Sequence, residues 1–141
     1  MPGNSSPVIL VDDSRIEKHL ARRSFERSGS DRVLLCFVSG EELLEHLDKV
    51  RTGDEPMPGV ILLDMNMPGL DGFAILEAIK NDAHFAGRLS VIVLTNAARV
   101  DDRDRAIGLG AAGFEIKPAT IGEYTEFFAV LEAKQPGFTA F

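Results

Sequence analysis

The sequence predicts an α/β protein built on a parallel sheet that helices cover on both faces. Five short apolar runs alternate with five stretches of helical character along the 141 residues. Most of the runs are continuously apolar, which is typical of strands buried on both faces. Five such units joined by right-handed crossovers favour a doubly wound (βα)5 sheet with the strand order 2-1-3-4-5.

The first four predicted strands are rich in Val, Ile and Leu, whereas the fifth contains Gly113 and Glu115. The predicted strands cover residues 8–11, 33–38, 60–63, 90–94 and 112–116. Cys36 lies within the second run, where a small apolar residue fits the core and no paired histidine favours a catalytic thiol.

Local capping signals predict where most of the helices begin. Ser14, Ser39 and Thr120 are each followed three residues later by Glu, the pattern of a capping box. A third helix begins near Asp71, and a fourth covers about 99–109, where a run of charges and two glycines weaken helical propensity.

Apolar spacing indicates which helical faces enter the core. The first helix ends near Ser28, before Gly29. The first helix carries the apolar residues Ile16, Leu20, Ala21 and Phe25, and the second carries Leu43, Leu47 and Val50. The third helix carries Ile75, Leu76 and Ile79, and the fifth carries Ile121, Tyr124, Phe128 and Leu131.

Length and composition favour one globular domain. We expect it to occupy residues 7–134, between a disordered or extended segment 1–6 and a tail 135–141 that contains Phe138 and Phe141. The net charge of −7 argues against direct nucleic-acid binding, which needs clustered Lys and Arg. Neither a secretory signal pattern nor an apolar run long enough for a membrane span is present, so a cytoplasmic location is expected.

Reactive side chains follow four of the five predicted strands. Asp12 and Asp13 follow the first strand, Asp64 the third, Thr95 the fourth and Lys117 the fifth. Each residue alone also suits a helix cap, a turn or a solvated surface charge. In the order 2-1-3-4-5, however, these four strands are adjacent, and their carboxyl ends meet where open α/β sheets bind ligands.

Charge repulsion predicts that this cluster binds a cation. Two carboxylates about 4 Å apart repel by roughly 4 kcal/mol at an effective dielectric of 20. One lysine cannot offset three converging carboxylates and an incoming anion as well. All-oxygen ligands supplemented by water suit Mg²⁺, with Mn²⁺ as an alternative.

Taken together, these motifs resemble the receiver domain of two-component response regulators, the single-domain CheY-like type with a flavodoxin-like fold. The resemblance extends from about Pro7 to Ala133 and rests on the segments Val11 to Ser14, Leu63 to Gly72, Leu94-Thr95 and Phe114 to Pro118. It implies that Asp64 is the phospho-acceptor, which takes a phosphoryl group from a histidine kinase in a Mg²⁺-dependent reaction.

The same resemblance assigns roles around Asp64. It implies that Asp12 and Asp13 hold the metal, with Asp13 favoured as the direct ligand, and that the backbone carbonyl of Asn66 is a further ligand. Thr95 would contact the phosphoryl oxygens and Lys117 would pair with them.

The resemblance also implies a readout and a particular backbone geometry. Thr95 and Phe114 match the switch positions, and Lys117-Pro118 is expected to be a cis peptide. Two residues depart from the family pattern: Asn96 is larger than usual, and Ala97 lacks a side chain that could position an attacking water.

The implied function is that of a stand-alone signalling switch and not of an enzyme acting on external substrates. The face formed by the fourth helix, fifth strand and fifth helix would signal to an unidentified protein partner, or the domain would relay phosphate. A weaker resemblance to phytochrome-associated regulators suggests a bacteriophytochrome-type kinase and leaves a homodimer open. The tail phenylalanines suit either a partner contact or packing on their own domain.

Two other functions are retained as alternatives. A phosphatase using Asp64 as nucleophile would need an acid two residues later, where this chain has Asn66. A pure binding module would not need the complete set of Asp12, Asp13, Thr95 and Lys117. Flavin or nucleotide binding is disfavoured, because no Gly-rich loop follows the first strand.

Overall fold

The computed structural model describes residues 6–29, 32–65, 71–96 and 99–134. It contains a five-stranded parallel sheet in the order β2-β1-β3-β4-β5, which confirms the predicted topology. The strands are β1 (Val8–Val11), β2 (Leu34–Phe37), β3 (Val60–Asp64), β4 (Val91–Thr95) and β5 (Gly113–Ile116).

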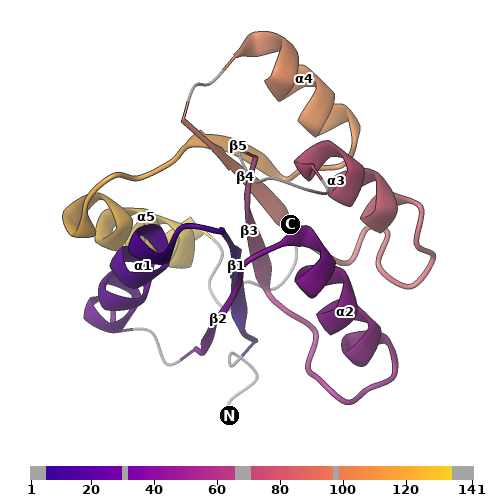
Figure 1. The fold of residues 1–141 in the computed structure, drawn as a ribbon, viewed down its shortest axis with the longest axis horizontal. Helices are drawn as coiled ribbons and strands as arrows, with labels where there is room; N and C mark the ends of the chain where they lie inside the picture. The colour runs from indigo at the N-terminus through magenta and orange to yellow at the C-terminus, as the bar shows by residue number, and fades with distance from the viewer. Residues whose placement is uncertain (1–5, 30–31, 66–70, 97–98, 135–141) are drawn as a thin grey trace.

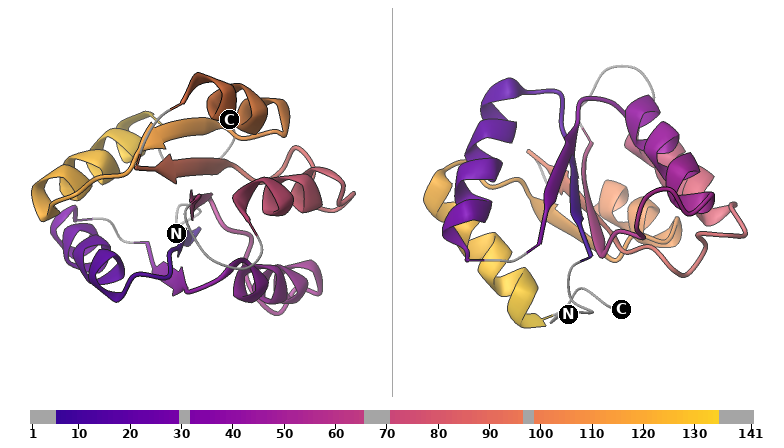
Figure 2. Two further views of the ribbon diagram at one scale, coloured as in Figure 1. Left: turned by 45° about the horizontal axis from the view of Figure 1, so that its top comes forward. Right: turned by 90° about the horizontal axis from the view of Figure 1, so that it is seen from below.

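Helices cover both faces of this sheet. They are α1 (Arg15–Arg27), α2 (Gly40–Arg51), α3 (Gly72–Lys80), α4 (Val100–Gly108) and α5 (Ile121–Lys134). Helices α1 and α5 lie on one face, and α2, α3 and α4 lie on the other (Figures 1 and 2). Alternate residues of the central strands therefore enter two separate cores, as Leu62 and Leu63 do.

The strand register aligns the carboxyl ends of four strands. Val11 of β1 pairs with Leu63 of β3, Asp64 with Leu94 of β4, and Thr95 with Ile116 of β5. The residues that end or follow these strands consequently lie along one edge of the sheet.

The predicted caps form at the helix starts. The backbone N–H groups of Glu17, Glu42 and Glu123 donate to the hydroxyls of Ser14, Ser39 and Thr120 at 3.1–3.2 Å, and that of Ala74 donates to Asp71 at 2.8 Å. Helix α4 begins after Arg99 without a side-chain cap, in keeping with its weak sequence signal.

The apolar face predicted for α1 was wrong at Ile16. That side chain is 73% exposed, and Ser24 is buried in the face instead. The Ser24 hydroxyl lies 2.7 Å from the carbonyl oxygen of Leu20 and 3.0 Å from that of Ile121 on α5. The hydroxyl can donate its one hydrogen to either of these carbonyl oxygens, so a polar side chain is tolerated in the α1–α5 contact.

One side chain is buried without a sequence signal, and one expectation is corrected. His46 lies on α2, is 9% exposed, and its ring centre lies 5.0 Å from that of Phe37. No cis peptide occurs in the described ranges, so Lys117-Pro118 is trans. The trans bond is the lower-energy isomer, and with it the Lys117 N–H donates to the Thr95 carbonyl at 2.7 Å.

The segments outside the described residues include several predicted features. The predicted extended segment 1–6 lies there except for Ser6, and so does the whole tail 135–141. Among the described helices, none has the length and apolar character required to span a bilayer.

Candidate functional site

The predicted reactive residues meet at the carboxyl edge of the sheet. Asp12 directly follows β1, Asp64 ends β3, Thr95 ends β4 and Lys117 directly follows β5. Asp12 is fully buried, Asp64 is 2% exposed and Thr95 is 7% exposed. Polar and charged groups are rarely this buried unless they are paired. Their burial therefore distinguishes this cluster from a group of solvated surface charges.

Lys117 connects the two buried carboxylates. Its Nζ lies 2.9 Å from Oδ2 of Asp12 and donates a hydrogen bond to Oδ2 of Asp64 at 3.0 Å. The contact with Asp12 is an ion pair without a well-directed hydrogen bond. The other oxygen of Asp12, Oδ1, accepts from the backbone N–H of Ser14 at 2.8 Å.

Burial and ion pairing have opposite effects on the pKa values of Asp12 and Lys117. Burial raises the pKa of Asp12, although Lys117 and the Ser14 N–H favour its charged form. Burial lowers the pKa of Lys117, but its contacts with Asp12 and Asp64 outweigh that effect and leave it raised. The lysine is therefore held charged, while one ammonium does not fully stabilise the Asp12 carboxylate.

The acidic cluster fits a divalent cation. Oxygen atoms of Asp12, Asp13 and Asp64 lie within 4.8 Å of one another, and Asp13 is exposed. With Lys117 as their counter-ion, the three carboxylates retain a formal excess of two negative charges. Hard oxygen ligands of this charge suit Mg²⁺ or Mn²⁺. The expected carbonyl ligand of Asn66 lies outside the described residues.

The predicted switch residues occupy different environments. Thr95 is buried beside the site, whereas Asn96 after it is exposed. Phe114 on β5 is 6% exposed and packs in the core beneath α2, α3 and α4. Ala97 lies outside the described residues.

A contact between α1 and α5 next to the site was missed from the sequence. The Tyr124 hydroxyl donates to Oε1 of Glu17 at 3.1 Å, and its ring is fully buried. Burial raises the pKa of Tyr124, and the negative charges of Glu17, Asp12 and Asp64 raise it further. The spacing of Tyr124 marked it as a core residue, but its partner is 107 positions away and local patterns do not identify such a pair.

A close approach beside Asp64 was also missed. A Cβ added to Gly72 would lie 2.4 Å from Sδ of Met65, the residue that follows Asp64. A larger residue at the start of α3 would therefore displace Met65. The Asp71-Gly72 pair suggested a helix start, and nothing in that signal pointed to this contact.

A doubly wound sheet with its charged groups gathered at the strand ends defines a domain that handles a charged ligand at that edge. Comparison with known families then identifies the domain. Residues 8–128 match the model of the response regulator receiver domain, and the chain belongs to that family.

Individual relatives agree with this membership. The chain is 31% identical over 111 residues to the probable methanogenesis regulatory protein FilR2 of Methanothrix harundinacea. This match covers 79% of the chain and 71% of that protein. It is 31% identical over 106 residues to the response regulator Rcp1 of Synechocystis, which covers 72% of this chain and 71% of Rcp1.

Solved structures show the same architecture. A response regulator in red light signalling of R. palustris superposes with a TM-score of 0.84 at 26% identity and covers 96% of each chain. The Mn²⁺-bound form of Rcp1 superposes with a TM-score of 0.77 at 26% identity, over 91% of this chain and 92% of that one.

Family membership gives the general function. The protein is a CheY-like receiver domain of two-component signalling, as the sequence motifs predicted. Receiver domains are signalling domains that bind a divalent metal at an acidic pocket and interact with histidine kinases.

Proposed function

We propose that Asp64 accepts a phosphoryl group from the phosphohistidine of a histidine kinase and that this modification switches the domain between two signalling states. One observation carries the proposal: the Lys117 ammonium lies between the buried carboxylates of Asp12 and Asp64. A cation in this position can stabilise negative charge that arrives at Asp64.

The reaction requires little of the protein beyond positioning and charge. A carboxylate oxygen of Asp64 attacks phosphorus in line, a P–O bond forms and the P–N bond to the histidine breaks. Lys117 stays beside the phosphoryl group and neutralises charge on its oxygens.

Asp12 and Asp13, with Asp64, are the residues that would hold a divalent cation. When bound, Mg²⁺ supplies Lewis-acid stabilisation of the phosphoryl oxygens. Asp13 suits direct metal contact because its carboxylate is exposed, while Asp12 is oriented by Lys117 and by the Ser14 N–H. The Asn66 carbonyl is assigned as a further ligand on the strength of the family pattern alone.

Thr95 and Phe114 carry the readout in this proposal. A phosphoryl oxygen near the Thr95 hydroxyl provides a new acceptor and draws the loop after β4 inward. Movement of that loop would alter the packing of Phe114 on the adjacent strand.

The face made by α4, β5 and α5 is the proposed signalling surface. Large apolar side chains are exposed on each of these elements: Val100, Ile107, Ile116 and Val130. Exposed apolar residues that gather into one patch often mark protein contacts, and we propose that these four form such a patch. The proposed output is therefore a protein partner, or onward transfer of the phosphoryl group.

A kinase of the bacteriophytochrome type is the proposed donor. Its support is the structural similarity to the red-light regulator of R. palustris and to the bacteriophytochrome response regulator AtBRR, the latter with a TM-score of 0.72 at 25% identity. A panel of histidine kinases, phytochrome-linked and otherwise, tests this by comparing initial rates of phosphotransfer. Equal rates across the panel would overturn the assignment.

Phosphorylation by acetyl phosphate with Mg²⁺ tests the central proposal without a kinase. Intact-mass analysis should detect one added phosphoryl group on the wild type and none on Asp64→Asn. Asp71→Asn is the matched control, because Asp71 caps α3 and is exposed. Equal labelling of wild type and Asp64→Asn would disprove the role of Asp64.

A further inference from the structure

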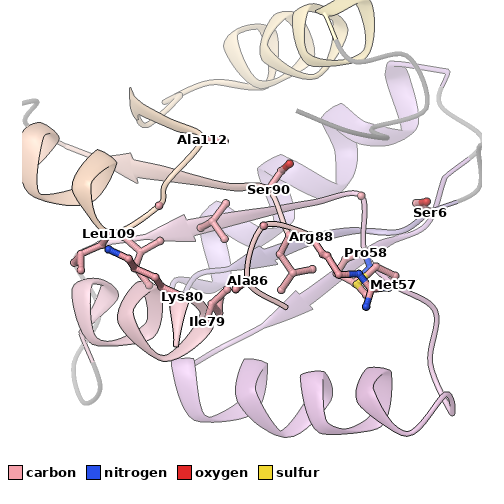
Figure 3. Close-up of a pocket in the computed structure, with 16 residues that line it drawn as sticks. Ser6, Met57, Pro58, Ile79, Lys80, Ala86, Arg88, Ser90, Leu109 and Ala112 are labelled. Atoms are coloured by element: carbon pink, nitrogen blue, oxygen red, sulfur yellow. The ribbon is translucent and has the colours of Figure 1, made fainter. Parts of the chain in front are cut away.

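A cavity of about 530 Å³ lies at the amino-terminal edge of the sheet, at the opposite end from Asp64 (Figure 3). Its walls include Gly59, Ser90 and Ala112, which immediately precede β3, β4 and β5. The volume is in the range of pockets that enclose small molecules or anchor side chains. This hollow is separate from the phospho-acceptor site.

The cavity has an apolar floor and a cationic rim. Met57, Leu89 and Leu109 line it and are each only partly buried. Nζ of Lys80 donates to the carbonyl of Gly108 at 3.1 Å, and a guanidinium N–H of Arg88 donates to that of His84 at 3.2 Å. In Figure 3, Lys80 and Leu109 lie toward one end of the cavity, and Arg88 and Met57 toward the other.

This lining suits an aromatic side chain. Apolar surface favours the ring, and a nearby ammonium or guanidinium is attracted to the face of the ring. Within the described residues, the same chemistry occurs at two other places. The guanidinium of Arg105 lies 4.0 Å from the ring centre of Phe73, and that of Arg51 lies 5.1 Å from that of Phe85.

Helix α5 ends at the same end of the molecule as the cavity. Helix α5 follows β5 and returns antiparallel to the strands, so it ends at the amino-terminal edge of the sheet (Figure 2). Residues 135–141 come next, with Phe138 and Phe141 and no charged side chain. Ser6 also lines the cavity, but the residues that precede it in the sequence, 1–5, include no aromatic residue.

The reach of the segment selects one phenylalanine. From the α5 layer to the α3–α4 layer, the path around the sheet edge is roughly 20 Å, at about 10 Å per layer. An extended chain covers at most about 3.6 Å per residue. From Lys134, Phe138 therefore reaches about 14 Å and Phe141 about 25 Å. By backbone reach, Phe141 attains the α3–α4 side of the cavity, where Lys80 and Leu109 lie, whereas Phe138 attains only the side formed by the strand starts.

We propose that the cavity is the docking site of the chain's own segment 135–141, with the Phe141 ring on the apolar floor between Lys80 and Arg88. Phe138 then packs along the edge of the sheet that the segment crosses. The docked segment ties the end of α5 to the ends of α3 and α4. This inference is independent of the proposed phosphorylation of Asp64.

Isotope-filtered NMR on the full chain tests the docking directly. Nuclear Overhauser effects are expected between Phe141 ring protons and methyl groups of Met57, Leu89 or Leu109 in uniformly labelled protein. They should be absent from intermolecular spectra of an equal mixture of labelled and unlabelled protein. Absence of these contacts, or their appearance in the intermolecular spectra, would overturn docking within one chain; the latter result indicates a second copy.

Unfolding equilibria provide the second measurement. Phe141→Ala should lower the ratio of folded to unfolded protein about tenfold, because one buried aromatic side chain is lost. Thr139→Ala, the matched control in the same segment, should change it little. The double variant with Phe141→Ala and Arg88→Gln should lose less free energy of unfolding than the sum of the two single losses. Strict additivity would contradict the proposed contact.

Discussion

The two edges of the sheet have opposite chemical character although the same strands form both. At the carboxyl edge, Asp12, Asp64 and Lys117 are buried together. At the amino edge, the residues that precede β3, β4 and β5 are uncharged, and Lys80 and Arg88 remain exposed at the rim of a cavity.

Charges dominate the free energy at the carboxyl edge, and apolar packing dominates it at the amino edge. Buried like charges are unfavourable unless a cation compensates them, so the carboxyl edge suits cation binding and adds little to folding stability. The amino edge is stabilised by apolar packing such as that of Phe85, which is 1% exposed. Substitutions at the two edges should therefore affect different measurements.

The largest effect on stability is expected from Phe85→Ala at the amino edge. The Phe85 ring fills the core beside α2 and α3, and truncation should lower the free energy of unfolding by about 3–5 kcal/mol. Urea unfolding measures this loss. Phosphorylation of the remaining folded protein should stay within about twofold of wild type, because no charge at the carboxyl edge has changed.

Phe85→Leu is the control for this substitution. It keeps most of the apolar volume, and its loss should stay below about 1.5 kcal/mol. A strong fall in the phosphorylation rate of folded Phe85→Ala protein would show that the two edges are coupled. Substitutions at one edge would then affect both stability and phosphorylation.

The next effect is expected from Lys117→Ala at the carboxyl edge. Removing this cation should slow phosphorylation by acetyl phosphate about 10²–10³-fold, the usual consequence of losing one group that stabilises transition-state charge. Single-turnover rates at saturating Mg²⁺ measure the change. Lys80→Ala, which removes a lysine at the opposite edge, should leave the rate unchanged. If both variants react at the wild-type rate, Lys117 has no role in the reaction.

The smallest effect concerns His46, on α2 beside β2, the strand that ends without a reactive group. Burial lowers the pKa of His46 below its usual 6.5, with smaller opposing and reinforcing effects of Glu55 and Lys49. The unfolded state therefore binds the proton more readily. The contribution of His46 to stability is complete above about pH 6.5 and declines as the pH falls toward its folded-state pKa.

Comparison of urea midpoints at about pH 7.5 and about pH 5.5 tests this sign. The wild type should lose more stability on acidification than His46→Gln, while His19→Gln, at an exposed position, should follow the wild type. The raised pKa of Asp12 acts in the opposite direction, but it is common to all three proteins. If the wild type and His46→Gln lose stability equally on acidification, the ionisation of His46 does not contribute to the pH dependence of unfolding.

Local sequence patterns predicted the elements well because their causes are local. Capping side chains at Ser14, Ser39 and Thr120 act within one turn, and continuous apolar runs require burial on both faces. The positions of Asp64, Thr95 and Lys117 at strand ends followed from the same patterns. Strand limits differed by one residue at places such as Val33 and Val38, where the sheet edge exposes the side chain.

Features that depend on distant partners could not be predicted in this way. Ile16 matched the apolar spacing of α1, yet no neighbouring element covers it and it is 73% exposed. His46 lacked any pattern that indicated burial against Phe37. The pairing of Glu17 with Tyr124 and the contact of Gly72 with Met65 require the packed positions of separate segments.

By itself, the sequence determined the strand order, the helix starts and the set of charged residues at the carboxyl edge, because periodicity, capping and chain connectivity are encoded over short distances. Only the tertiary structure decided how those charges are paired. Lys117 lies between Asp12 and Asp64 because β5, β1 and β3 place their ends together across more than fifty positions of chain, at distances that no local pattern specifies.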